Sequence, residues 1–159
     1  MCEVDAVDRA ILHELQRDGR LPNVSLAERV HLSPSACLRR LKALEDAGLI
    51  RGYQALLDRR KLGLDLTVFV EVEITGHSPE RAAEFEKAIA EIDEIVSCHI
   101  IAGPFEFLLQ VVVADMAAYE TLHLRTLLAL PGVSRMRSHI AVRAMKEAGP
   151  LPLRARGRA

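Results

Sequence analysis

The sequence predicts an α+β protein whose two parts differ in secondary structure. Apolar residues recur at helical spacing up to about residue 47, whereas runs rich in Val, Phe and Thr alternate with helical stretches from residue 64 onward. The charge changes at nearly the same place. Residues 1–62 carry 11 basic and 9 acidic side chains, and residues 63–147 carry 7 and 13. Both changes predict a domain boundary at the charged connection 58–63.

The size and composition of the chain are those of a folded protein with one or two small domains. It has 159 residues, of which 50% are hydrophobic, enough apolar surface to offset the entropy lost on ordering. Three widely spaced cysteines favour a reducing compartment over a disulfide framework. The acidic N-terminus and the short apolar runs predict neither a signal peptide nor a membrane span. We therefore expect a cytoplasmic protein with no membrane partner.

Three helices are predicted in the first part. The first follows Asp5, a residue type that caps helix N-termini, and ends before Gly19. A short second helix covers about 25–30. The third begins at Ser33-Pro34, where serine caps the free N–H groups and proline suits the first helical position, and it runs to about residue 47. Two short helices joined by a brief turn form a helix-turn-helix arrangement.

A short strand or wing is expected next, at Leu49–Leu56. The second part then alternates between strand and helix patterns in the order β-α-β-β-α-β, which is the ferredoxin-like arrangement. The last residues, 148–159, are rich in Pro, Gly and Arg and predict a basic flexible tail. The strands are expected at 64–74, 95–102, 105–113 and 133–145, and the helices at 79–92 and 115–130.

The third helix is the best candidate for a functional surface. With Leu41 as the centre of its buried face, Leu38 falls on the buried side, and the opposite side is small, hydroxylated and basic. Arginine can bind guanine through two hydrogen bonds, flanking cations suit phosphates, and small residues permit close approach to a groove. An ordinary solvated basic face is the alternative interpretation. The residues predicted to bind DNA are Ser33, Ser35, Ala36, Arg39, Arg40 and Lys42.

The sequence resembles the Lrp/AsnC (feast/famine) family of transcription regulators over about residues 4–147. In the first part the likeness is carried by DRAILHELQRDGR (8–20), LSPSACLRR (32–40) and LIRGY (49–53). In the second part it is carried by CHIIAG (98–103), FEFLL (105–109) and LPGV (130–133). The ordered set looks closer to the leucine-responsive branch than to the asparagine-responsive branch.

This resemblance implies a domain organisation and a set of partners. Residues 1–57 would form a winged helix-turn-helix DNA-binding domain, 58–63 a linker, and 64–147 a ferredoxin-like domain for effector binding and oligomerisation. Members of the family form dimers that assemble into octamers or larger rings. Two-fold assembly predicts a pseudo-palindromic site on double-stranded DNA. The expected small molecule is an amino acid, with no cofactor and no enzymatic activity.

The resemblance also implies where an effector would bind, between subunits of neighbouring dimers. Gly103 permits close backbone approach, and Glu106 offers a carboxylate to an α-ammonium group. Pro104 departs from the usual Gly-Asp-Tyr/Phe-Asp turn, which leaves the effector's identity open, and a plain β-turn is the alternative. The predicted effector-binding residues are Ala102, Gly103, Pro104, Phe105 and Glu106 and, from another subunit, Leu130, Ser134, Met136 and Ser138.

Other functions are less favoured by the sequence. The six histidines have no close partner at the usual metal-ligand spacings, so no metal site is expected. Certain tetrapyrrole decarboxylases of the haem pathway resemble the family in both domains, but the basic face at 35–42 argues against that enzyme alternative. An effector-binding protein with a relic helix-turn-helix is the remaining alternative.

Overall fold

The computed structural model describes residues 4–76, 78–147 and 149–153. The chain divides into two compact units. One comprises the described residues of 1–56 and 146–159, and is called the helical unit below. The other is Leu57–Met145, called the sheet unit. The chain therefore passes from one unit to the other twice, once after Leu56 and again after Met145.

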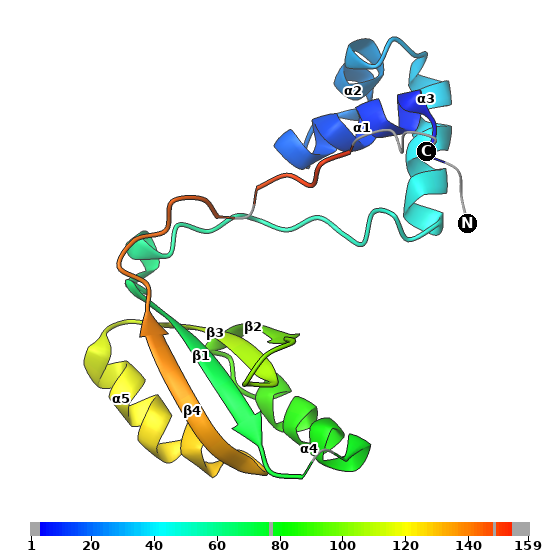
Figure 1. The fold of residues 1–159 in the computed structure, drawn as a ribbon. Helices are drawn as coiled ribbons and strands as arrows, with labels where there is room; N and C mark the ends of the chain where they lie inside the picture. Colours follow the sequence, from blue (N-terminus) through cyan, green and yellow to red (C-terminus); the bar gives the residue numbers. More distant parts are fainter. Residues whose placement is uncertain (1–3, 77, 148, 154–159) are drawn as a thin grey trace. The chain divides into compact units, whose positions relative to one another are not determined.

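The helical unit contains α1 (Ala6–Arg17), α2 (Asn23–Arg29) and α3 (Pro34–Asp46), which Figure 1 labels. The predicted caps are present. Asp5 accepts a hydrogen bond from the Asp8 amide while the Asp8 side chain accepts one from Asp5, which is a capping box. The core of the unit is made by Ile11, Leu26, Ala27, Val30, Cys37 and Leu44.

The strand expected at Leu49–Leu56 is absent, and that prediction was wrong. Residues 51–58 have no helix or strand hydrogen bonding. A strand needs a neighbouring strand to pair with, and the described residues of this unit contain none. The segment is instead tied locally, because the Tyr53 hydroxyl donates to Glu45 Oε1 at 2.9 Å. Desolvation, and then the Glu45 carboxylate, raise the pKa of Tyr53 to about 12.

The described part of the C-terminal segment contacts α1. Leu151 N donates to Gln16 Oε1 at 2.6 Å, and Gln16 Nε2 donates back to Leu151 O at 3.3 Å. One side chain thus binds both backbone groups of one residue, which holds Leu151 against the helix. Residues 154–159, which complete the predicted tail, lie outside the described residues.

The sheet unit has the predicted β-α-β-β-α-β order, with a four-stranded antiparallel sheet in the order β2-β3-β1-β4. Short 3₁₀ helices, η1 (Arg60–Leu62) and η2 (Leu127–Ala129), precede β1 and follow α5. The remaining elements are β1 (Leu66–Ile74), α4 (Pro79–Ala90), β2 (Ile95–Ile100), β3 (Phe107–Val113), α5 (Met116–Arg125) and β4 (Val133–Ile140).

Both helices cover the same face of this sheet (Figure 1). Val68, Val70 and Val72 of β1 pack into one core with residues from α4 and α5, including Phe85 and Leu122. Because side chains alternate along a strand, the odd-numbered residues of β1 point to the opposite face. We call that side the open face of the sheet.

Two elements end five residues earlier than the sequence predicted. The helix expected over 115–130 ends at Arg125 and continues as η2. The strand expected to reach residue 145 ends at Ile140. Its only neighbour is β1, and the last ladder contact is the bond from Ala141 N to Thr67 O at 2.9 Å. Beyond that point only Leu66 of β1 remains, so β1 is too short to pair with a strand that continues to residue 145.

Candidate DNA-binding surface and effector region

Helix α3 is held in place by its neighbours at its N-terminal end. Ser33 Oγ accepts from Ala36 N at 3.3 Å, which caps the helix. Asn23 Nδ2, at the start of α2, donates to Pro34 O at 2.9 Å. The turn between α2 and α3 contains His31 with φ 55°, a left-handed conformation that non-glycine residues seldom adopt. These contacts present α3 at a defined angle to α2.

The exposed face of α3 carries Ser35, Leu38, Arg39 and Lys42. Among the described residues, no hydrogen bond or ion pair engages Arg39 or Lys42. Ala36, also predicted to contact DNA, is half-buried beside them. An uncovered helix face with two unengaged cations suits a polyanionic groove.

Leu38 is the residue of this surface that the sequence argument missed. It was placed on the buried side, but it is 55% exposed. The buried stripe passes through Cys37 and Leu44, with Leu41 only half-buried, so it is rotated from the assumed centre. The signal that would have found Leu38 is its position one residue from Cys37, about 100° around the helix.

Arg40 points elsewhere. Its Nη1 donates to Asp5 Oδ2 at 2.7 Å and to Asp8 Oδ1 at 2.8 Å. The amide of Asp8 and then the Arg40 guanidinium lower the pKa of Asp5. The same two carboxylates raise the pKa of Arg40. Of the cations predicted to bind DNA, Arg40 is therefore engaged by α1 and its N-cap. Arg39 and Lys42 have no such partner among the described residues.

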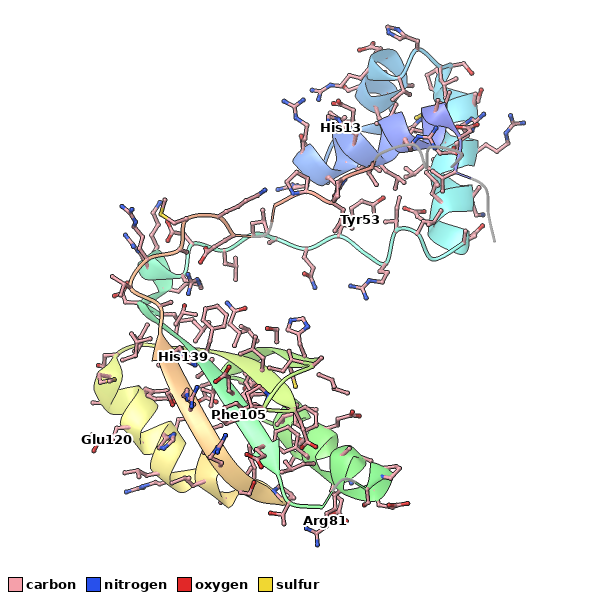
Figure 2. The ribbon with its side chains drawn as sticks, viewed as in Figure 1. His13, Tyr53, Arg81, Phe105, Glu120 and His139 are labelled. Atoms are coloured by element: carbon pink, nitrogen blue, oxygen red, sulfur yellow. The ribbon has the colours of Figure 1, made fainter. Side chains whose placement is uncertain are left out.

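The turn predicted to bind an effector lies on the open face of the sheet. Phe105 is only 1% exposed, although no helix covers that face. Two guanidinium groups of β4 cover its ring, Arg135 at 4.6 Å and Arg137 at 5.2 Å from the centroid. Phe105 and His139 are labelled in Figure 2, where β4 can be followed beside β1.

Glu106 is bound to the end of the sheet. Its Oε2 accepts from Ile74 N at 3.2 Å, and its own amide donates to Val72 O at 3.1 Å. The carboxylate thus supplies an acceptor at the point where the pairing of β1 and β4 is interrupted, next to Glu73 and Ile74. A ligand ammonium group at this carboxylate would have to share it with the Ile74 amide.

The second predicted set does not join this turn within one sheet unit. Leu130 is 7% exposed, and Met136 packs against the same core beneath the sheet. Ser138 Oγ lies 2.6 Å from Tyr119 Oη on the helical side, while Ser134 Oγ donates to Glu73 O at 3.0 Å. Leu130 and Met136 serve the unit's own packing, whereas Ser134 and Ser138 are exposed residues that also hydrogen-bond within the unit.

Two surface hollows of the sheet unit lie away from that turn. The larger, about 590 Å³, is an open apolar depression between α4 and β2 that includes Ile89 and Cys98. The smaller, about 480 Å³, is polar and lies between the start of α4 and Gly132. Neither contains a residue of 102–106.

The open face carries a charged network that the sequence argument did not assemble. Glu73 pairs with Arg135 at 3.3 Å, while Glu71 pairs with Arg137 at 3.8 Å and lies 3.2 Å from His139 Nε2. The alternation of basic residues along β4, opposite the acidic residues of β1, was the available signal. Cross-strand neighbours of opposite charge stabilise such pairing.

Other kinds of site find no support in the described residues. They contain no group of three or more His, Cys, Asp and Glu side chains placed to hold a metal ion. No helix among them is long and apolar enough to cross a membrane. The described cysteines, Cys37 and Cys98, are free thiols, and burial raises the pKa of each.

Comparisons with known proteins match both units. The winged helix-turn-helix DNA-binding family matches residues 4–51, and the Lrp/AsnC ligand binding domain matches residues 67–151. The chain is 42% identical to the leucine-responsive regulatory protein of Escherichia coli K12, over 97% of this chain and 94% of that protein. The same protein of Klebsiella pneumoniae gives equal identity and coverage.

Solved structures agree with the sequence comparison. A transcriptional regulator of Neisseria meningitidis, solved as a complex with L-Met, is 41% identical with a TM-score of 0.91, covering 95% of this chain and 97% of the other. An AsnC family regulator of Agrobacterium tumefaciens is 36% identical with a TM-score of 0.89, covering 94% and 97%. E. coli AsnC, at 19% identity and a TM-score of 0.80, shows the fold alone.

These relatives are named as regulators of transcription, which does not favour the haem-pathway alternative. The resemblance found in the sequence is confirmed, as is the predicted fold of a helix-turn-helix domain followed by a ferredoxin-like domain. The chain belongs to the Lrp/AsnC family and is a DNA-binding transcription regulator with a ligand-binding domain.

Proposed function

We propose that this regulator reads a pseudo-palindromic DNA site as a homo-oligomer and that an amino acid changes its assembly or its DNA affinity. The observation that carries the DNA-reading part is the exposed face of α3, whose two cations have no partner among the described residues. It acts where chromosomal DNA is, in the cytoplasm.

On this surface Arg39 reads a base edge and Lys42 contacts a phosphate. Ser35 and Ala36 lie near the helix N-terminus, where small side chains and free N–H groups allow close approach to the backbone. Leu38 adds an apolar contact of the kind that thymine methyl groups accept. Ser33 acts mainly through its cap on Ala36.

The DNA-reading role is tested with sites obtained by genomic selection of bound fragments, with and without a panel of amino acids. Arg39→Ala is expected to weaken binding to a selected site by about 1–3 kcal/mol while changing binding to random DNA much less. Arg125→Ala, an exposed arginine of the sheet unit, is the matched control. An equal loss on selected and random DNA would contradict base reading by Arg39.

For the ligand, the turn Ala102–Glu106 offers what a free amino acid requires. Glu106 supplies a carboxylate for the ammonium group, while Arg135 and Arg137 lie beside Phe105 and can receive the ligand's carboxylate. The complex of the Neisseria relative with L-Met supports an amino acid as the ligand class. Ser134 and Ser138 of a neighbouring subunit complete the site, while Leu130 and Met136 shape it through the core.

Calorimetry with L-Met, L-Leu and L-Asn tests this site. Glu106→Gln keeps an oxygen for the Ile74 amide but removes the charge, so amino-acid affinity should fall by about tenfold or more without loss of folding. Pro104→Asp restores the acidic residue of the usual family turn and should tighten binding. Unchanged affinity in Glu106→Gln would leave Glu106 with a structural role only.

A second copy of the chain is the proposed partner of the open face. Acidic β1 and basic β4 lie side by side there, so a two-fold axis can place the acidic stripe of one copy against the basic stripe of the other. Phe69, 37% exposed on this face, supplies apolar area. Sedimentation should show smaller assemblies for Phe69→Asp, whereas Val142→Asp, outside the strands, should assemble normally.

A further inference from the structure

Arg40 differs from the other cations of α3 in its partners. Its guanidinium is half-covered, and one nitrogen, Nη1, donates to a carboxylate oxygen of Asp5 and to one of Asp8. Arg39 and Lys42, its neighbours on the same helix, are exposed. Arg40 therefore binds the residues at the start of α1, whereas the other two cations do not.

The two carboxylates also organise α1. Asp5 and Asp8 form its capping box, with Asp5 Oδ1 accepting from Asp8 N at 2.8 Å and Asp8 Oδ2 accepting from Asp5 N at 3.2 Å. Each side chain uses one oxygen for the cap and the other for Arg40. The Asp8 side chain is only 15% exposed, so this ion pair is shielded from solvent more than a surface pair.

The charges at this point disfavour a DNA phosphate. One guanidinium faces two carboxylates, so the cluster of Asp5, Asp8 and Arg40 has a formal charge of −1, from the residue types alone. A phosphate brought to Arg40 would meet that negative charge, and drawing Arg40 away would leave Asp8 without its cation. An uncompensated, partly buried charge is costly.

We propose that Arg40 is a positioning residue that fastens the recognition helix α3 to the N-terminus of α1 and thereby sets the angle at which Arg39 and Lys42 meet DNA. This inference rests on the proposed DNA-reading role of α3. It assigns to Asp5 and Asp8 a part in DNA recognition although acidic residues repel DNA.

The salt dependence of DNA binding by the full chain separates positioning from contact. Each phosphate contact contributes about 0.9 to the slope of log K against log salt concentration on duplex DNA. Lys42→Gln, the control for a true contact, should reduce the slope by about that amount per bound subunit. Arg40→Gln should leave the slope unchanged, lower affinity for the selected site about tenfold, as for loss of one base contact, and spare random DNA.

Asp8→Asn supplies a second, independent test, because asparagine keeps an oxygen for the cap but loses the charge that holds Arg40. Positioning predicts weaker binding to the selected site, by a factor similar to that of Arg40→Gln, at a temperature where circular dichroism shows both variants folded. A direct phosphate role for Arg40 predicts the opposite, stronger binding to all DNA, because a negative charge has been removed.

Three results would overturn the inference. A slope reduction in Arg40→Gln equal to that of Lys42→Gln would make Arg40 a phosphate contact. Tighter binding by Asp8→Asn would do the same without relying on Arg40→Gln. An unchanged slope in Lys42→Gln together with unchanged site affinity in Arg39→Ala would instead remove the DNA-reading surface itself, and the positioning role with it.

Discussion

The exposed face of α3 and the open face of the sheet both carry arginine, but the arginines of the two faces have different neighbours. Arg39 has no partner among the described residues. Arg135 and Arg137 pair with Glu73 and Glu71 and also cover the ring of Phe105. The same residue type thus suits a polyanion on one unit and, on the other, the proposed contact with a second copy, and the difference comes from the neighbouring carboxylates.

The largest expected effect is the loss of stability on removing Phe105, the buried residue of the open face. Phe105→Ala removes an aromatic side chain that is 1% exposed and should destabilise the sheet unit by about 3–5 kcal/mol. Urea unfolding followed by circular dichroism measures this change. Phe69→Ala, at a 37% exposed position, should cost much less, and equal costs would contradict the distinction between the two phenylalanines.

A smaller effect is expected at Leu38, the apolar member of the α3 face. Leu38→Ala should change the stability of the helical unit by no more than about 0.5 kcal/mol, since the side chain is largely exposed. It should weaken binding to the selected DNA site by about 1 kcal/mol, the lower end of the range for one contact. Fluorescence anisotropy and thermal unfolding of the same preparation give both values. A marked loss of stability would place Leu38 in the core after all.

The paired arginines of the open face should contribute little one pair at a time. Glu73→Gln removes the partner of Arg135 and is expected to change stability by about 0–1 kcal/mol, because the pair is solvent-exposed. The effect should shrink at high salt. Affinity for DNA should not rise, because the freed arginine lies on the sheet unit, and a clear gain in DNA affinity would contradict that assignment.

The smallest effect concerns acid pH and the ion pairs of Arg40. The folded-state pKa of Asp5 lies below its ordinary value of 3.8, so the stabilisation from its charged form is complete above the unfolded-state pKa. It is lost as the pH falls through the folded-state pKa. Thermal unfolding between pH 5 and pH 2 should therefore show a loss of stability that Asp5→Asn reduces. An identical pH profile in that variant would exclude Asp5 as a contributor.

Local features of the fold were predictable because they depend on residues close in the chain. Asp5 and Ser33 cap α1 and α3 as expected, since a cap uses a side chain and an amide within the same helical turn. The strand and helix order of the sheet unit also followed from periodicity. Element ends differed from the prediction where strand pairing sets them. One example is the end of β4 at Ile140, close to where β1 begins at Leu66.

The candidate sites were predictable only in part. The basic face of α3 was found, but the rotation of the buried stripe that exposes Leu38 depends on how α1 and α2 pack against the helix. The turn at Gly103–Glu106 was found as well. Its arginine cover was not, because Arg135 and Phe105 are distant in sequence and meet only when β4 pairs with β1.

The amino-acid pattern alone was enough to predict the helix caps, the order of helices and strands, the family and the position of the basic helix. Each of these depends on neighbouring residues or on an ordered motif. Which charged side chains engage one another depended instead on how the elements pack in space. Arg40 is engaged by carboxylates more than 30 residues earlier in the chain, and Glu106 is bound to the amide of Ile74. Charge interactions depend on distance in space, and that distance is set by packing between elements that no local pattern encodes.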